Sequence, residues 1–460
     1  MRPFSFVFLR GVLTVIFGLL VPLSYAQKLL LIVADGFGGS FYYKYSHLDG
    51  LRTFENEGVW SDLLYPEFPS LSIPNRQTLV SGLHPRNHHF VGNVVFNSSS
   101  GELFSNFNRP KDFDQKWWRF EPIYQQAARE GASVALFFWP ECDVKWSGTR
   151  PSLCFPPPSN GSSSLDANNV KNIIAATRTH DLVMVYHAAI KDEAMLMGPQ
   201  IMTKLSESSV NKLDQVLTRL AAEIRERVDL NLLVVSTHGI VDVPKENVRF
   251  IDDYLNMNLV NTTIGAGAVK QIVAHPGKTH QIFNHLRTDA PIPNVKIYYT
   301  TPRMGDLPKW YGYARSDVIP ELVLIAQPGH AILSKPTSPK QLPAASDEDW
   351  SRGMSGYNNE FPDMLGVFLA LGPAFKKGMR KGPANLVDIY PLMCHILSLD
   401  CPRGDGNMTN IDDVLVVSAL TSRAIPLEYY CGCEAKDVVR NPIAVEFVIR
   451  AYSCGGQGAK

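Results

Sequence analysis

Residues 28–37 read KLLLIVADGF, an apolar run that ends in an acidic residue and a glycine. Further short apolar runs occur at residues 133–138, 182–186, 232–236 and 365–370. Continuous apolar runs of this length, bounded by turn residues, are typical of parallel strands that are buried on both faces. The opening stretch therefore predicts the first strand of a buried sheet, with Asp35 at its carboxyl end.

Amphipathic patterns of helical period lie between these runs, at residues 123–130, 207–228 and 385–397. Strands that alternate with helices predict an α/β fold with a mostly parallel central sheet and helices on both faces. Residues 248–333 lack this alternation, and we expect them to form an inserted subdomain. Residues 151–165 are rich in Pro, Ser and Gly, which predicts a surface loop.

The amino terminus has the pattern of a secretory signal peptide. Arg2 and Arg10 precede the apolar run Gly11–Leu23, and small residues follow at positions 24 and 26. The run is short for a membrane span, although an uncleaved anchor is the alternative. We therefore expect residues 1–26 to be removed, one large domain over residues 27–415, and a cysteine-containing tail over residues 416–460. The expected product is secreted and extracellular, without a membrane anchor.

The charge balance excludes two classes of partner. Removing residues 1–26 takes away two arginines and leaves 42 basic and 44 acidic residues. Such a chain carries no basic footprint for nucleic acid and no polybasic patch for a membrane surface.

The seven cysteines and four sequons fit an extracellular chain. Disulfides are the expected state of cysteines outside the cell, and Cys142 with Cys154 would close a local loop. Because seven is an odd number, one cysteine is left as a free thiol or pairs with another chain. Disulfides are also expected for the Cys431-Gly432-Cys433 motif, with metal binding as the alternative to them. Acceptor sequences for N-linked glycans occur at four asparagines, namely Asn97, Asn160, Asn261 and Asn407.

Reactive side chains follow several of the expected strands. Asp35, His187 and His238 each stand at or directly after the carboxyl end of an apolar run. Open α/β sheets bind their ligands at this edge. Each residue alone is more typical of a helix cap or a loop hydrogen bond. Together at one sheet edge they indicate a site.

Ordered motifs across residues 28–415 resemble the ectonucleotide pyrophosphatase/phosphodiesterases, a branch of the alkaline phosphatase superfamily. The first motif is Asp35-Gly36-Phe37, and the nucleophile loop resembles residues 68–75 and 79–85. Asn93 stands where the family has an asparagine near the transferred phosphoryl group. The other matching stretches are Trp117-Trp118, Glu121-Pro122-Ile123, Phe137-Phe138-Trp139-Pro140, Ser236-Thr237-His238-Gly239, Gly356–Phe361, Leu371–Phe375 and Leu392-Met393-Cys394.

The resemblance implies an alkaline-phosphatase-like fold that carries two zinc ions in active relatives. It implies Ser72 as the nucleophile, with one zinc held by Asp35, Ser72, position 237 and His238. Here position 237 is Thr237, so one carboxylate is missing. Such a partial site would hold at most one weakly bound zinc.

The second zinc would be held by positions 191, 195 and 355, where the family has Asp, His and His. Here they are Lys191, Met195 and Ser355, none of which is an ordinary zinc ligand. The ammonium of Lys191 could take part of the cation's role, either by neutralising Asp35 or by binding a phosphate or sulfate near Ser72. The alternative is a solvated loop lysine.

Two functions remain open from the sequence. One is a secreted, catalytically silent relative whose pocket binds an anionic small molecule, a glycan or an extracellular protein. The other is an active phosphodiesterase that hydrolyses nucleotide or lipid-headgroup phosphodiesters through Ser72 with a reduced metal site. A serine hydroxyl without a base or a metal is a poor nucleophile at neutral pH, which favours the first.

Overall fold

A computed structural model describes most of the chain between residues 27 and 420. The described residues are 27–105, 115–144, 146, 148, 150–158, 165–166, 169–205, 207–301, 307–314, 316–335 and 352–420. The expected signal peptide, the sequon at Asn160 and the tail beyond residue 420, with its last three cysteines, lie outside them. The boundaries expected for the domain, its insertion and its tail stay predictions.

The core of the fold is a nine-stranded sheet with the order β18-β2-β17-β8-β1-β7-β5-β6, in which β19 also pairs with β2. At its centre β1 pairs in parallel with β7 and β8, and all three strands are almost completely buried. The strands are β1 (Lys28–Ala34), β2 (Val59–Tyr65), β5 (Val134–Phe137), β6 (Leu153–Phe155), β7 (Leu182–His187), β8 (Leu230–Val235), β17 (Gly366–Leu371), β18 (Met379–Arg380) and β19 (Ala384–Asn385).

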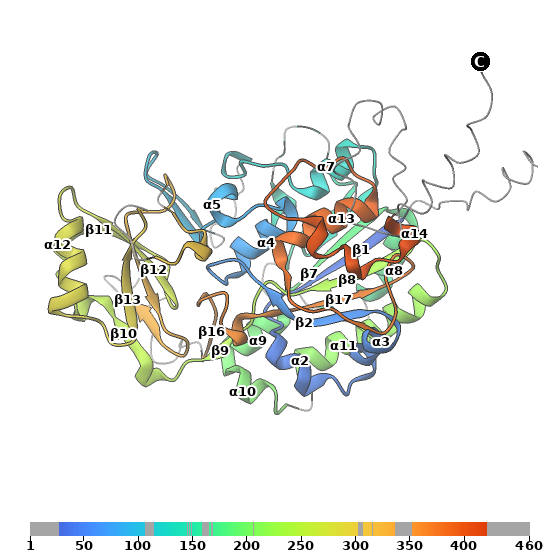
Figure 1. The fold of residues 1–460 in the computed structure, drawn as a ribbon, viewed down its shortest axis with the longest axis horizontal. Coiled ribbons are helices and arrows are strands. Elements are labelled where there is room, and N and C mark those ends of the chain that lie inside the picture. The colour runs from blue at the N-terminus through green and yellow to red at the C-terminus, as the bar shows by residue number, and fades with distance from the viewer. Residues whose placement is uncertain are drawn as a thin grey trace, which may run out of the picture. The chain divides into compact units, whose positions relative to one another are not determined.

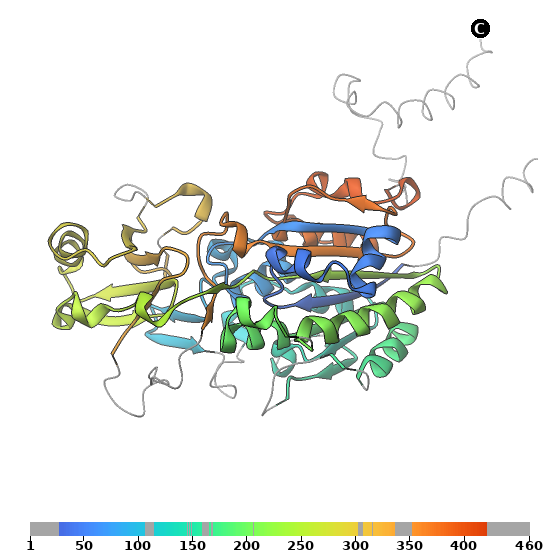
Figure 2. The ribbon, with the colours of Figure 1, turned by 90° about the horizontal axis from the view of Figure 1, so that it is seen from below.

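Helices cover both faces of this sheet, as the sequence predicts (Figures 1 and 2). Side chains alternate along β1, so that Leu29, Leu31 and Val33 pack into one apolar layer and the intervening residues into the other. The first layer contains side chains of α4 (Ser72–Ser81), α7 (Ile123–Arg129) and α13 (Ile389–Leu397). The second contains side chains of α2 (Gly39–Tyr45), α3 (Asp49–Glu57), α8 (Asn169–Thr179), α9 (Ala189–Met197), α10 (Pro199–Met202) and α11 (Ser209–Arg225).

The amphipathic patterns locate these helices to within a few residues. The pattern over 207–228 corresponds to α11, which begins after Ser208 because the side chain of this residue accepts a hydrogen bond from the backbone of Asn211. Its buried residues recur at helical spacing, and its hydrophobic face packs on the sheet.

Two expectations about strands are wrong. The run at 365–370 forms β17, which pairs antiparallel with both β2 and β8. It is buried on both faces like its parallel neighbours, so its composition does not reveal its direction. Part of the loop expected over 151–165 forms β6, an edge strand parallel to β5. This strand contains Cys154, whose disulfide with Cys142 ties the segment to η2 (Pro140–Asp143), the turn that follows β5.

A separate antiparallel sheet is formed by four strands between residues 260 and 326. Its order is β11-β12-β14-β13, from β11 (Val260–Ile264), β12 (Val269–Ala274), β13 (Val295–Tyr299) and β14 (Leu322–Ala326). The chain enters and leaves this region through the paired strands β10 (Val248–Phe250) and β15 (Ala331–Leu333). The ring of Tyr311 stacks on that of Phe68 with 4.0 Å between centroids, which joins the region to the loop before α4.

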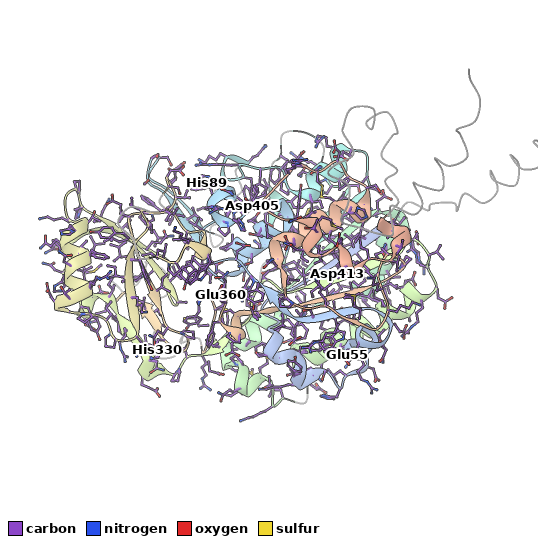
Figure 3. The ribbon with its side chains drawn as sticks, in the orientation of Figure 1. Glu55, His89, His330, Glu360, Asp405 and Asp413 are labelled. Carbon is purple, nitrogen blue, oxygen red and sulfur yellow. A yellow bond between two sulfur atoms is a disulfide. The ribbon has the colours of Figure 1, made fainter. Side chains whose placement is uncertain are left out.

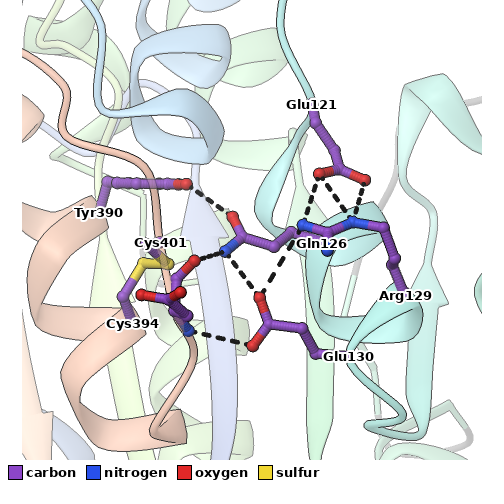
Figure 4. Close-up of a disulfide and its surroundings, with 8 residues drawn as sticks. Glu121, Gln126, Arg129, Glu130, Tyr390, Cys394 and Cys401 are labelled. Carbon is purple, nitrogen blue, oxygen red and sulfur yellow. Dashed lines mark hydrogen bonds and ion pairs between the residues drawn. A yellow bond between two sulfur atoms is a disulfide. The ribbon is translucent and has the colours of Figure 1, made fainter.

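Two disulfides occur within the described residues. Cys142–Cys154 is formed as expected, and Cys394–Cys401 closes the end of α13. Figure 4 shows the second bridge beside the side chain of Gln126, which donates to the Asp400 carbonyl at 2.8 Å and accepts from the Tyr390 hydroxyl at 3.0 Å. These bonds join α7 to α13 on the face of the sheet that also contains α4.

The described helices include none that is long and apolar enough to cross a membrane.

Three sequon asparagines lie in the described chain. Asn407 is exposed and Asn97 is partly exposed at the end of the strand β3 (Val94–Asn97). Asn261 is exposed on β11, an edge strand, so it does not lie in a surface loop as expected. Glycosylation at these positions stays a prediction.

Candidate functional site

The candidate site lies at the carboxyl ends of the three central strands. Asp35 follows β1, His187 ends β7, and Thr237 and His238 follow β8. Because Ala34 is in register with His187 and Val33 with Val235, these strands end at the same edge. The parallel register therefore brings together residues that are about 200 positions apart in the sequence.

Asp35 is the centre of the cluster and is completely buried. Its Oδ2 lies 3.1 Å from the Nζ atom of Lys191 and accepts a hydrogen bond from the Tyr186 hydroxyl. Its Oδ1 accepts a hydrogen bond from the Thr237 hydroxyl. Burial opposes ionisation of this carboxyl, but the charge of Lys191 and the two hydroxyl donors outweigh it, so the pKa of Asp35 is lowered.

Lys191 reaches Asp35 from the first half of α9. Its backbone N–H also donates to the Asp35 carbonyl at 3.1 Å, so the helix is held directly against the end of β1. Burial would lower the pKa of Lys191, but the negative charge of Asp35 and its hydrogen bond with the ammonium outweigh burial and raise this pKa above its ordinary value. Only 21 % of the side chain is exposed. The residue is therefore a charged helix residue paired with Asp35, not a solvated loop lysine.

The close approach of α9 depends on Gly36. This residue has a φ of 77°, and a Cβ atom placed on it would lie 2.8 Å from the Cα of Lys191. Any side chain at position 36 would thus be strained in its backbone and would push α9 away from Asp35.

Ser72 is the first residue of α4, and its Oγ lies 3.2 Å from Nε2 of His238. The Nδ1 atom of His238 donates to the Gly239 carbonyl at 2.9 Å. Burial lowers the pKa of His238, and the carboxylate of Asp35 only partly opposes this. A neutral ring that is protonated on Nδ1 can accept the Ser72 proton on Nε2. His238 Nε2 is also 3.5 Å from Asp35 Oδ1, so Ser72 joins the same cluster.

Asn93 lies beside the start of α4. Its Oδ1 accepts a hydrogen bond of 3.1 Å from the backbone N–H of Ile73, the residue that follows Ser72. The amide is thereby placed next to the candidate nucleophile, and one backbone donor of the helix start is satisfied by it.

Met195 lies on α9, and Ser355 follows a strand that packs on this helix. Met195 is one helical turn beyond Lys191 and packs among the apolar side chains on that face of the sheet. Ser355 is buried and follows β16 (Gly353–Met354), which pairs with β9 (Val241–Asp242). The strand β16 packs closely on α9: a Cβ atom placed on Gly353 would lie only 2.1 Å from the carbonyl oxygen of Ala194. Direct contacts thus join Asp35, Ser72, Lys191, Thr237 and His238, whereas the convergence of the other two positions stays a prediction.

Sequence reasoning missed Tyr186 and chose its neighbour His187. Successive residues of a strand face opposite sides of the sheet, and it is Tyr186 that bonds to Asp35. His187 is buried, and its Nδ1 accepts a hydrogen bond of 3.0 Å from the backbone N–H of Leu165. Burial lowers its pKa to about 4, so the ring is neutral at pH 7.

A buried ion pair supports Tyr186 from the other side. The guanidinium carbon of Arg76 lies 5.1 Å from the centre of the Tyr186 ring, and Arg76 pairs with Glu141 at 2.6 Å. Gln77 also donates to Glu141, at 2.8 Å, and accepts from the indole N–H of Trp118. Arg76 lies in the middle of α4, among largely polar residues, so the sequence indicates neither its burial nor its partner.

The residues present do not fit a two-zinc centre. The described residues contain no group of three or more His, Cys, Asp and Glu side chains that could hold a metal ion. Both oxygens of Asp35 are already bonded to protein groups, and position 191 supplies a cation where zinc would need an anionic ligand. The chemistry that these residues offer is a serine hydroxyl next to an imidazole, beside an internally neutralised carboxylate.

Comparison with known proteins places the chain in a family. Residues 29–358 match the family model "Type I phosphodiesterase / nucleotide pyrophosphatase". The human ectonucleotide pyrophosphatase/phosphodiesterase family member 5 is 28% identical over 408 residues, which is 87% of this chain and 80% of that protein. Human bis(5′-adenosyl)-triphosphatase ENPP4 is 27% identical over 401 residues, or 85% of this chain and 83% of that protein.

Solved structures agree with these matches. The structure of human ectonucleotide pyrophosphatase/phosphodiesterase 5 superposes with a TM-score of 0.74 at 28% identity, covering 85% of this chain and 100% of that one. An inactive variant of the murine protein in complex with AMP gives 0.74 at 27% identity, with the same coverage. The protein therefore belongs to the type I phosphodiesterase / nucleotide pyrophosphatase family and has its alkaline-phosphatase-like α/β fold.

Proposed function

We propose that this chain is a secreted, catalytically silent member of its family. The observation that carries the proposal is the ion pair between Lys191 and Asp35, with 3.1 Å between Nζ and Oδ2. The resemblance makes Asp35 a zinc ligand, but here a protein cation already occupies one of its oxygens. A protonated lysine cannot ligate a metal, and its charge repels one. The remaining Ser72 and His238 are too few to hold zinc firmly.

Secretion is part of the proposal and has two supports. The first is the pattern of residues 1–26, which has basic residues, an apolar run and small residues in the order of a signal peptide. The second is the pair of disulfides, because such bridges form and persist in oxidising compartments.

We further propose that the pocket retains affinity for a small anion such as a phosphate monoester. A murine relative has been solved with AMP, and the Ser72 hydroxyl and the amide nitrogen of Asn93, beside the start of α4, are donors of the kind that bind phosphate. Because Asp35 balances the charge of Lys191, we expect this affinity to be weak. A glycan or an extracellular protein are the other partners that the pocket could serve.

One observation favours a second candidate function, an active phosphodiesterase with a reduced metal requirement. His238 is placed to accept the Ser72 proton, and a serine with an adjacent base is an activated nucleophile. In this reaction Ser72 Oγ would attack phosphorus, its proton would move to His238 Nε2, and the alcohol or phosphate leaving group would depart. Water would then hydrolyse the phosphoseryl intermediate.

Hydrolysis of a nitrophenyl phosphodiester separates the alternatives when it is measured with and without a chelator. The silent protein gives no turnover above that of Ser72→Ala in either condition. Turnover that resists the chelator and is lost in Ser72→Ala and His238→Ala would establish the second candidate. Turnover that the chelator abolishes, with about one zinc bound per chain, would contradict the silent protein and support the second candidate with a single metal. Two zinc ions per chain would contradict both.

AMP binding tests the proposed ligand class. Lys191→Ala leaves the negative charge of Asp35 uncompensated, so we expect affinity for AMP to fall several-fold. The matched control is Lys44→Ala, because the ammonium of Lys44 donates to Thr203 on the surface and not to the site. Equal affinity of wild type and Lys191→Ala would show that AMP does not bind beside this ion pair.

A further inference from the structure

A cleft whose lining contains no residue of the Asp35 cluster lies between the β3–β4 hairpin and η1. The hairpin contributes Asn97, Ser100 and Glu102 to its walls. The 3-10 turn η1 (Gln115–Trp117) and the chain that follows it contribute Lys116, Trp117 and Arg119. The hairpin consists of β3 and β4 (Glu102–Ser105), and Asn97 is paired with Glu102 across it. His89, which follows α5 (Pro85–His88) and is labelled in Figure 3, also lines the cleft.

The walls of this cleft are tied to one another, so the cleft is preformed. Lys116 pairs with Glu102 at 2.6 Å, which joins η1 to the hairpin. Ser98 donates to the Asp317 carbonyl from its backbone nitrogen at 2.8 Å and from its hydroxyl at 2.9 Å. Arg119 forms an ion pair with the carboxylate of Asp317. A ligand would therefore meet groups that are already positioned and lose little conformational entropy in ordering them.

The chemistry of the lining fits a neutral, hydroxyl-rich ligand. The charges of Lys116 and Arg119 are balanced by Glu102 and Asp317, which gives no net attraction for an anion. Carboxylate, ammonium, guanidinium, amide and hydroxyl groups together offer both donors and acceptors. The indole of Trp117, held at 5.6 Å from the ring of Phe104, adds an apolar surface. A sugar ring has this combination of hydroxyl edges and an apolar face.

The size of the cleft and the position of Asn97 indicate the source of the sugar. The volume of about 190 Å³ is below the ~300 Å³ at which sites for drug-sized ligands begin, so the cleft suits one or two small rings. Asn97 begins the sequon Asn97-Ser98-Ser99 and itself lines the cleft. Its Oδ1 accepts from the backbone of Ser99 at 2.9 Å and of Ser100 at 3.2 Å, which orients the amide whose nitrogen would carry an N-linked glycan.

We propose that the cleft binds a saccharide, and that its occupant is the first part of a glycan attached to Asn97 of the same chain. Attachment makes binding intramolecular, so modest contacts with Trp117, Glu102 and Lys116 suffice to hold the sugar. This inference rests on the proposed secretion, because N-linked glycans are added to secreted chains.

Native deglycosylation tests the proposal on full-length protein secreted from animal cells. The rate at which peptide N-glycosidase releases each glycan is followed by site-resolved mass spectrometry, with the exposed Asn407 as internal reference. We expect release at Asn97 to be at least about tenfold slower than at Asn407. A tenfold ratio requires only about 1.4 kcal/mol of binding free energy between the sugar and the cleft. The two rates should become equal after denaturation.

Variants separate contact with the sugar from simple crowding. Trp117→Ala should bring the Asn97 rate close to the Asn407 rate, whereas Trp310→Ala, at an indole that is 60% exposed elsewhere, should leave the ratio unchanged. Glu102→Gln serves as a second variant if Trp117→Ala does not fold, and it should raise the Asn97 rate as well.

Several outcomes would overturn the proposal. An unmodified Asn97 beside a glycosylated Asn407 would refute it while leaving secretion intact. Equal release rates in the native wild type would refute it, and so would protection that persists in the variants. Absence of glycan from every sequon of a chain recovered only inside the cell would instead contradict the secretion on which it rests.

Discussion

Removing the cation from the Asp35 cluster should destabilise the fold strongly. At 3.1 Å and an effective dielectric constant of ~20, the attraction between Lys191 and Asp35 is about 5 kcal/mol. Partial exposure of Lys191 reduces this value, and Thr237 and Tyr186 keep donating to the carboxylate in the variant. We therefore expect Lys191→Met to lower the free energy of unfolding by about 2–4 kcal/mol, close to the ~3–5 kcal/mol typical of a broken buried pair.

Urea unfolding at neutral pH measures this loss, and a double-mutant cycle with Asp35→Asn isolates the coupling between the two side chains. The matched control is Arg225→Met, which breaks an ion pair with Glu57 on the surface. This pair is at least as short, at 2.6 Å against 3.1 Å for Lys191 and Asp35, but 45% and 41% of its side chains are exposed. Such exposed pairs contribute about 0–1 kcal/mol. A coupling for Lys191 and Asp35 no larger than that of this surface pair would refute the reasoning.

The pH dependence of the same variant gives an independent check. In the wild type the pKa of Asp35 is lowered, so its stabilising contribution is present above the unfolded pKa of about 3.9 and is lost only in stronger acid. Without Lys191 the buried carboxyl loses its main compensating charge, and its folded pKa rises. As the pH falls, Asp35 becomes protonated in the variant, and the cost of its unpaired buried charge disappears. The stability deficit of Lys191→Met should accordingly be largest near pH 7 and should narrow toward pH 4.

Further predictions concern the groups around the cluster. Gly36→Ala should lower the free energy of unfolding in urea by about 2–4 kcal/mol, because left-handed backbone strain adds to a clash with α9. The control Gly131→Ala, at a φ of 92° with nothing within 4 Å of the added Cβ, should show the backbone cost alone. Similar losses in the two variants would contradict the close approach of α9. Arg76→Met should cost about 3–5 kcal/mol because it leaves Glu141 buried without its cation, and the double variant with Glu141→Leu should recover part of the loss; an unchanged midpoint would show that the pair is not buried. Replacing Cys142 and Cys154 by serine opens a loop of 12 residues and should cost about 3 kcal/mol, measured by thermal unfolding, with no change expected if the bridge is not formed in the secreted protein.

The α/β architecture could be predicted because its strands and helices have different periods. The run at 28–34 is identical to β1, and the pattern at 389–397 lies within the expected helix. The direction of β17 could not be predicted, because a strand buried on both faces has the same composition whichever way it runs. The edge strand β6 was hidden by flanking prolines, which indicate a loop locally, while its pairing with β5 depends on a distant partner.

In the site, residues that belong to local motifs could be predicted, whereas contacts between residues far apart in the sequence could not. The resemblance placed Asp35, Ser72 and His238 at one edge, and neutralisation of Asp35 was one of the roles left open for Lys191. The role of Tyr186 could not be inferred, because the choice between two adjacent residues at a strand end depends on which face of the sheet each side chain occupies. The ion pair of Arg76 and Glu141 was also missed, since residues 65 positions apart reveal no contact by their types alone.

Zinc content, measured together with hydrolysis, tests the central claim most directly. The account predicts that the purified secreted protein binds well below one zinc per chain and does not hydrolyse nitrophenyl phosphodiesters, with or without added zinc. It also predicts that the combined changes Lys191→Asp, Met195→His, Thr237→Asp and Ser355→His raise zinc uptake. Two zinc ions per wild-type chain, with turnover that a chelator abolishes, would contradict the account.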